Sequence, residues 1–108
     1  MALLLKCKVS SIKIMAQEKE LEKKLIKAVK KVGGLPLKFV SPGYDGVPDR
    51  LILIAFGKVG FVEVKAPGEE PRKLQLKRHQ KLRSLGFKVY VLDDEKQIGG
   101  IIDDICSA

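Results

Sequence analysis

The sequence predicts an α/β fold in which helices flank a mixed sheet, in the order αβββαβα. Two segments with the helical spacing of apolar residues, 17–32 and 72–85, each end at glycine, and short apolar runs lie between and after them. The second helix connects two strand-like runs, and such a crossover places both strands parallel in one sheet. With 108 residues, 45% of them hydrophobic, the chain is long enough for one core and too short for two.

The first helix is expected over residues 17–32. Its apolar residues recur at a spacing that places them on one face, and lysine and glutamate fill most other positions. The apolar residues are Leu21, Leu25, Ala28, Val29 and Val32. Gly33 and Gly34 end the helix.

Residues 1–15 are expected to form an N-terminal extension to a domain that spans 16–108. This extension is either flexible or an over-called start, so its removal should be tolerated. Its apolar run, residues 2–5, is broken by Lys6 and Lys8 and is too short for the core of a secretion signal. No apolar run in the sequence is long enough to span a membrane.

Four apolar runs are expected to form the sheet. They are residues 35–40, 51–56, 61–66 and 87–92. The run 61–66 alternates, so Val62 and Val64 should face the core while Glu63 and Lys65 share the opposite face. A short final helix is expected over 94–105, weakened by two glycines.

The second helix, 72–85, is expected to pack through Leu74, Leu82 and Leu85. Its other face is cationic and carries Arg72, Lys73, Lys77, Arg78, Lys81 and Arg83. Such a face is often merely solvated, but its position directly after the Glu63 strand favours contact with phosphates.

The charge balance favours a polyanionic partner. The chain has 21 Lys and Arg against 13 Asp and Glu, a net charge of +8, which most often indicates nucleic acid binding. Cys7, Cys106 and the single histidine, His79, have no zinc-site spacing. Two distant thiols fit a reducing cytoplasm.

Three residues suggest a metal-dependent hydrolytic site. Asp49 precedes one predicted strand, and Glu63 and Lys65 lie two apart on the next. Two carboxylates are the ligands that Mg²⁺ or Mn²⁺ takes beside water and phosphate, and an ammonium group neutralises charge on a phosphate. The Val64 carbonyl is a further possible ligand. Taken singly, Asp49 is also compatible with a turn and Glu63 with a solvated strand face.

The sequence resembles a known nuclease family. Pro48-Asp49, followed after a hairpin by Glu63-Val64-Lys65, resembles the PD-(D/E)XK nuclease superfamily. The longer pattern KFVSPGYDGVPDR, FVEVKAPG and Leu74-Gln75 resembles the VRR-NUC family, the virus-type replication-repair nuclease domain, over roughly residues 18–105. The resemblance implies a restriction-endonuclease-like core.

The resemblance also implies residue roles. Asp49 and Glu63 become metal ligands, Lys65 the catalytic lysine, and Gln75 a residue that supports the lysine or contacts phosphate. Gln75 is otherwise readable as an ordinary exposed helix residue. The superfamily also places a glutamate on the first helix, for which we prefer Glu22 as a metal ligand.

Glu18 is the substitute for Glu22, because it lies on the same helical face, whereas Glu20 points elsewhere.

The chemistry also selects a hairpin register. A turn at residues 55–57 would place Asp49 opposite Glu63, whereas a turn at Gly57-Lys58 would leave them roughly 10 Å apart along the strands. We therefore expect the earlier turn, or a bulge that corrects the later one.

Several residues are expected to contact DNA. They are Arg50, Arg72, Lys73, Lys77, Arg78 and Tyr44, with Asp45 beside Tyr44. His79 is expected at the surface, facing DNA or solvent. Phe39, Phe61, Phe87 and Tyr90 lie in strand runs and are expected in the core, which leaves no platform for stacked bases.

The resemblance implies a Mg²⁺- or Mn²⁺-dependent DNA endonuclease of the bacterial or phage type, with no small-molecule cofactor and no membrane. One site in so small a domain favours a homodimer that resolves Holliday junctions. The alternatives are a flap or non-specific nuclease in phage replication or repair, and a non-catalytic DNA-binding module.

Overall fold

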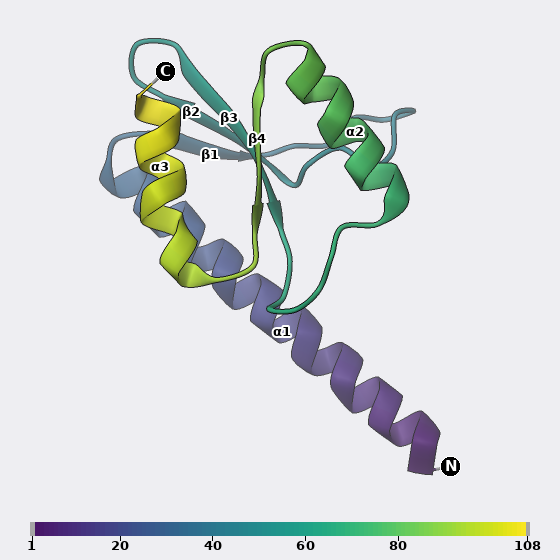
Figure 1. The fold of residues 1–108 in the computed structure, drawn as a ribbon. Helices are drawn as coiled ribbons and strands as arrows, with labels where there is room; N and C mark the ends of the chain where they lie inside the picture. The colour runs from purple at the N-terminus through teal and green to yellow at the C-terminus, as the bar shows by residue number, and fades with distance from the viewer. Residues whose placement is uncertain (1, 108) are drawn as a thin grey trace.

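The computed structural model has three layers (Figure 1). It describes the backbone of residues 2–107 and the side chains of residues 11–107. The elements are α1 (Ala2–Lys31), β1 (Leu35–Lys38), β2 (Arg50–Ile54), β3 (Lys58–Val64), α2 (Lys73–Ser84), β4 (Lys88–Leu92), the 3₁₀ turn η1 (Glu95–Gln97) and α3 (Ile98–Cys106). Helices α1 and α3 cover one face of the sheet and α2 covers the other, which confirms the predicted order and fold class.

The sheet is mixed, as predicted. Its strand order is β1-β2-β3-β4. The first two pairings are antiparallel, and β3 pairs with β4 in parallel. Helix α2 makes the crossover between these parallel strands, so it lies against the sheet beside the end of β3.

The β2–β3 hairpin has the register that the chemistry selects. Its turn occupies residues 55–57, and the ladder runs from Ile54 opposite Lys58 to Arg50 opposite Val62. Continuing this ladder by one residue places Asp49 opposite Glu63. The predicted register is therefore confirmed without a bulge. Phe56 was expected in a strand, but it lies in the turn with a φ of 67° and is 97% exposed.

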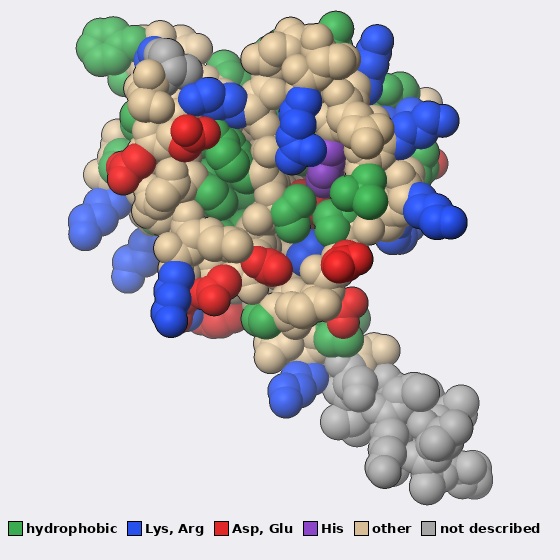
Figure 2. All heavy atoms as spheres, in the orientation of Figure 1, with side chains coloured by type: hydrophobic (Ala, Val, Ile, Leu, Met, Phe, Trp, Pro, Cys, Tyr) green, Lys and Arg blue, Asp and Glu red, His purple; other side chains and the backbone are tan. Residues whose placement is uncertain are grey.

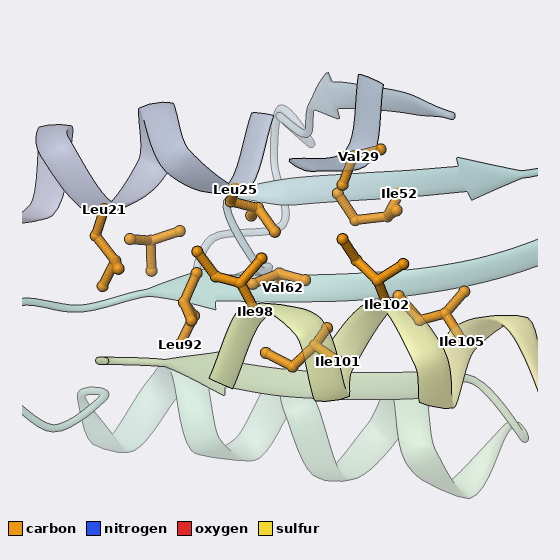
Figure 3. Close-up of a cluster of buried hydrophobic side chains, with 11 residues drawn as sticks. Leu21, Leu25, Val29, Ile52, Val62, Leu92, Ile98, Ile101, Ile102 and Ile105 are labelled. Carbon is orange, nitrogen blue, oxygen red and sulfur yellow. The ribbon is translucent and has the colours of Figure 1, made fainter. Parts of the chain in front are cut away.

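The core lies between the sheet and the layer of α1 and α3 (Figure 3). Its members are Leu21, Leu25 and Val29 from α1, Ile52, Val62, Val64 and Leu92 from the sheet, and Ile98, Ile101, Ile102 and Ile105 from α3. Val62 and Val64 point into this core, so Glu63 between them must point toward α2. Val32 was expected on the buried face, but α1 ends at Lys31 and Val32 is exposed.

Helix α1 begins at Ala2 rather than at Gln17. Its 30 residues correspond to about 45 Å, and Figure 1 shows the N-terminal part leaving the body of the molecule. Ile12 and Met15 on this part are largely exposed. Within the described residues, no helix combines the length and the apolar character needed to cross a membrane.

Helix α2 packs through polar rather than apolar side chains, contrary to expectation. Leu74 and Leu85 are 40% and 60% exposed and Leu82 is half-buried, whereas Gln75 and His79 are buried. Gln75 and His79 lie four residues apart and therefore share the face that meets the sheet. The helix was expected to bury its leucines, but the surface beneath it carries the carboxyl of Glu63 and selects polar partners.

The aromatic residues are only partly in the core. Phe61 is buried and lies between Phe39 and Phe87, at centroid distances of 5.4 Å in a tilted pair and 5.8 Å in an edge-to-face pair. Phe87 is 44% exposed, contrary to expectation, because it precedes the start of β4 at Lys88. Tyr90 is half-buried, and its hydroxyl donates to Asp104 on α3.

The close packing of α3 on β3 gives a stability prediction. A Cβ at Gly60 would lie 2.5 Å from Cδ1 of the buried Ile105. We expect Gly60→Ala to lower the free energy of unfolding by ~1–3 kcal/mol, as overpacking does. Urea unfolding followed by circular dichroism measures this change.

Gly99→Ala is the matched control, because a Cβ at Gly99 in α3 meets no atom within 4 Å. Alanine in a helix should there stabilise by up to ~1 kcal/mol. Equal effects of the two substitutions would contradict the packing argument.

Candidate active site

The carboxyl groups of Asp49 and Glu63 meet where β2 begins and β3 ends. Asp49 follows the fully buried Pro48, and its carbonyl accepts the Phe39 N–H at 2.9 Å. Its Oδ2 accepts the backbone N–H of Val64 at 2.8 Å. These two hydrogen bonds fix the Asp49 side chain beside the last residues of β3, as the register requires.

Glu63 is almost completely buried, with 1% exposure. Its Oε2 accepts from Nε2 of Gln75 at 3.3 Å and lies 3.8 Å from Nζ of Lys65. Its Oε1 has no hydrogen-bond partner among the described residues, and Nε2 of His79 lies 3.4 Å away. The side chain is therefore enclosed by α2 on one side and by Asp49 and Lys65 on the other.

The pKa of Glu63 is raised to about 8, chiefly by burial and then by hydrogen bonding and like charge from the neighbouring Asp49 carboxyl. The ammonium of Lys65 opposes this shift in the pKa. Two carboxylates in one partly buried site repel each other unless a cation lies between them or one takes up a proton. The two carboxylates therefore give the site the negative charge that favours binding of a cation.

The residues present fit a hard divalent cation. Glu63 Oε1 is a buried oxygen without a partner, and Asp49 supplies a second carboxylate beside it. Within the described residues, no cluster of three or more His, Cys, Asp and Glu side chains has metal-holding geometry. Mg²⁺ is commonly held by one or two carboxylates, with water and substrate phosphate completing its octahedron. The donor set therefore suits Mg²⁺ or Mn²⁺ better than zinc.

Lys65 lies on the same strand face as Glu63, as the alternation of β3 predicts. Its backbone N–H donates to the Leu92 carbonyl at 2.8 Å, which extends the pairing with β4 beyond Val64. Its side chain is 15% exposed, so the ammonium lies at the edge of the buried pocket. Val64, whose carbonyl is the predicted further ligand, uses its N–H to hold Asp49.

Gln75 connects α2 to Glu63. Its Oε1 accepts the Arg72 N–H at 2.8 Å at the helix N-terminus, and its Nε2 donates to Glu63. With 6% exposure it is not an ordinary surface residue. The side-chain hydrogen bond that Gln75 donates is to Glu63, and its role in supporting Lys65 or contacting phosphate stays a prediction.

The expectation for His79 is wrong. The ring is 0% exposed and lies beneath Glu63 rather than facing solvent. Burial, followed by the positive charge of Arg83, lowers the pKa of His79, so the imidazole is neutral near pH 7. The sequence contained a signal for this position, because His79 follows Gln75 by one helical turn.

The two helix glutamates have different surroundings. Glu22 Oε1 accepts from Nε of Arg50 at 3.2 Å and from a second guanidinium nitrogen, and Nη1 of Arg50 donates to the Pro36 carbonyl at 3.1 Å. Glu22 and Arg50 thereby join α1 to β2 and β1. Glu18 Oε1 instead lies 3.4 Å from the Ala66 N–H, next to Lys65. Glu20 is exposed.

The loop before Asp49 is attached to α2. Arg78 stacks on the ring of Tyr44 at 3.8 Å, and its Nε donates to the Asp45 carbonyl at 2.7 Å. Gly46 has a φ of 88°, and a Cβ there would lie 2.9 Å from Leu74, so only glycine permits this close approach. Arg78 is thus engaged with the loop rather than free.

The remaining predicted DNA contacts differ in availability. Arg72 at the N-cap of α2 and Lys73 and Lys77 on the helix are exposed, whereas Arg50 is held by Glu22. In the view of Figure 2, most of the acidic side chains gather near the point where α1 leaves the body, and lysine and arginine side chains lie at both sides and in the upper middle. A groove between α1 and the end of β4 is lined by Glu20, Asp93, Asp94 and Glu95, with Lys24 paired to Glu95 at 2.8 Å.

The raised pKa of Glu63 gives a prediction for the protein in chelator. The folded state holds a proton that the unfolded chain releases near the usual pKa of 4.5, so stability should fall as pH rises from about 4.5 to about 8. Glu63→Gln removes this loss and should be more stable than wild type above pH 8, by on the order of 1–3 kcal/mol.

Thermal unfolding of both proteins between pH 5 and pH 9 measures the difference, which should grow with pH. Glu69→Gln, on the exposed loop after β3, serves as the control. Parallel pH profiles of wild type and Glu63→Gln would contradict the assigned cause.

Comparison with known proteins identifies relatives of the chain. No protein-family model matches it. It is 51% identical over 81 residues to "Putative nuclease p44" of Acyrthosiphon pisum secondary endosymbiont phage 1, a match covering 75% of this chain and 87% of that protein.

A solved structure described as a VRR_NUC domain superposes with a TM-score of 0.76 at 31% identity, covering 81% of this chain and 95% of the other. Both matches agree with the family resemblance of the sequence, and the structural match agrees with the observed fold. The chain belongs to the VRR-NUC family of nucleases.

Proposed function

We propose that the protein is a Mg²⁺- or Mn²⁺-dependent DNA endonuclease that hydrolyses phosphodiester bonds. The observation that carries this proposal is the meeting of the Asp49 and Glu63 carboxyls beside the Lys65 ammonium. A divalent cation held by the two carboxylates, with the Val64 carbonyl as a further possible ligand, would polarise the phosphate and lower the pKa of the attacking water.

Lys65 is the residue that acts on the reacting phosphate. Its ammonium lies at the edge of the pocket, 3.8 Å from Glu63, where it can meet both substrate and water. Hydrolysis forms a bond from the water oxygen to phosphorus and breaks the bond from phosphorus to the leaving oxygen. Negative charge builds on the phosphate in the transition state of this reaction. A fixed cation beside that charge lowers the barrier. Gln75 acts behind it by holding Glu63.

Glu18 is the α1 carboxylate that we assign to the site. The sequence favours Glu22, but Oε1 of Glu22 accepts two hydrogen bonds from the Arg50 guanidinium. Glu18 instead lies beside Ala66, and its charge contributes to the raised pKa of Glu63. This electrostatic contact supports a role for Glu18 in attracting the cation, whereas Glu22 holds α1 on the sheet.

DNA is proposed to approach over α2 and the loop before Asp49. The exposed Arg72, Lys73 and Lys77 follow the strand that carries Glu63, and Tyr44 is 42% exposed beside Arg78. Phosphates would be repelled from the acidic groove at the end of β4. Charge therefore directs the backbone toward the α2 side of the carboxylates.

Branched DNA, cut by a homodimer, is the proposed substrate. One chain offers one site, so paired cuts in a four-way junction need two copies, and symmetric dimers are the commonest way to provide them. Exposed apolar side chains away from the carboxylates, Ile12 and Met15 on α1 and Phe56 in the hairpin turn, are available for such an interface. A flap or non-specific nuclease remains the alternative.

The first test is cleavage of labelled four-way junction, flap and linear duplex DNA with Mg²⁺, Mn²⁺ or chelator. Lys65→Ala should lower the rate ~10²-fold or more, as loss of a charge-stabilising group does. Lys58→Ala, at the other end of β3, should leave the rate unchanged. Paired junction cuts would support a dimeric resolving enzyme.

Cleavage of the flap DNA alone would support the assigned active site but contradict the four-way junction as the substrate. DNA binding of equal affinity with chelator and with Mg²⁺ or Mn²⁺, and no cleavage with either metal, would indicate a non-catalytic DNA-binding module.

A second test separates the two glutamates of α1. Glu18→Gln should raise the Mg²⁺ concentration needed for half-maximal cleavage and leave thermal stability close to wild type. Glu22→Gln should instead destabilise by ~1–3 kcal/mol, because it leaves the half-buried Arg50 without its carboxylate. The reverse pattern would restore Glu22 as the carboxylate of the site.

A further inference from the structure

We propose that His79 is a positioning residue that donates its Nε2–H to Oε1 of Glu63, so that α2 holds both oxygens of this carboxylate. The proposal rests on the proposed function, in which Glu63 is a metal ligand. It assigns a role to a buried group that the nuclease pattern leaves unexplained.

The first observation is a pair of buried atoms without partners. His79 is 0% exposed, and neither ring nitrogen makes a hydrogen bond to any described residue. Oε1 of Glu63 is also buried and unpartnered, and it lies 3.4 Å from Nε2 of His79. Buried polar atoms are rarely left unpaired, and a small rotation of the ring would bring these two to hydrogen-bonding distance.

The second observation is that Gln75 makes the matching contact one helical turn earlier. Its Nε2 donates to Oε2 of Glu63, while its Oε1 is fixed by the Arg72 N–H. Gln75 and His79 therefore present one donor to each oxygen of the same carboxylate. Together they would fix the plane of the carboxyl and the directions of its remaining lone pairs, which are those available to a cation.

The chemistry of the ring makes the tautomer decisive. A neutral imidazole carries one N–H, so it can donate to Oε1 only if the proton lies on Nε2. The Nδ1–H tautomer would turn a lone pair toward the carboxylate and repel it. The proposal therefore predicts one tautomer, whether or not the protein cleaves DNA.

Because His79 is the single histidine in the chain, its ring nitrogens can be observed without residue assignment. Protein labelled with ¹⁵N-histidine should show the pattern of neutral Nε2–H imidazole in long-range ¹H–¹⁵N spectra at pH 9, where Glu63 is a carboxylate. Glu63→Gln should shift these resonances, and Glu69→Gln should not. A neutral Nδ1–H ring, which has no proton on Nε2 to donate, would overturn the proposal.

A matched pair of variants tests the consequence for the metal. His79→Gln keeps a side-chain N–H donor, whereas His79→Met has similar length and no donor. Binding of Mn²⁺, measured by calorimetry without DNA, should weaken ~10–100-fold in His79→Met and recover largely in His79→Gln. Equal Mn²⁺ affinity in wild type and both variants would overturn the proposal.

The cleavage assay distinguishes this proposal from the proposed function. Wild type that binds Mn²⁺ in a His79-dependent way but cuts no DNA would keep the positioning role and reject the nuclease substrate. Wild type that cuts DNA while His79→Met keeps normal Mn²⁺ affinity would support the nuclease function and reject the positioning role of His79. If His79→Met does not fold, as judged by circular dichroism, the tautomer measurement still decides.

Discussion

The buried carboxyl of Glu63 is the constraint on which the rest of the site depends. A carboxyl with 1% exposure needs polar neighbours, and the fold supplies them from three elements: Asp49 before β2, Lys65 after β3 and the polar face of α2. The loss of hydration is what makes the site suitable for a cation, since water no longer screens the charge of the two carboxylates.

Apolar packing on the opposite face of β3 offsets the free-energy cost of burying Glu63. Val62 and Val64 are packed into the apolar core beneath α1 and α3, so the strand cannot rotate to bring Glu63 into solvent. Apolar burial on one side and polar enclosure on the other follow from a single alternation of side chains along the strand. The strand thus separates the layer that provides stability from the layer that carries the chemistry.

The sequence predicts the element order, the mixed sheet, the hairpin register and the placement of Glu63 and Lys65 on one face, because strand alternation and turn position are local properties. It does not predict the packing of α2, since apolar spacing favours burial of Leu74 and Leu85 while the partner surface is a carboxyl. The choice between Glu18 and Glu22 also depends on tertiary structure, because where α1 crosses the sheet decides which turn meets Arg50. The sequence does contain one clue to the burial of His79, because Gln75 and His79 are polar residues spaced one helical turn apart.

The attachment of the Tyr44 loop to α2 has a mechanical consequence. Arg78 joins the helix to the loop that leads into Asp49, and Gln75 joins the same helix to Glu63. Both carboxylates therefore share one support, although they belong to different strands. A polyanion bound on α2 would therefore rest on the helix that makes both attachments, while the hairpin and the hydrogen bond from the Val64 N–H to Asp49 set the spacing of the pair.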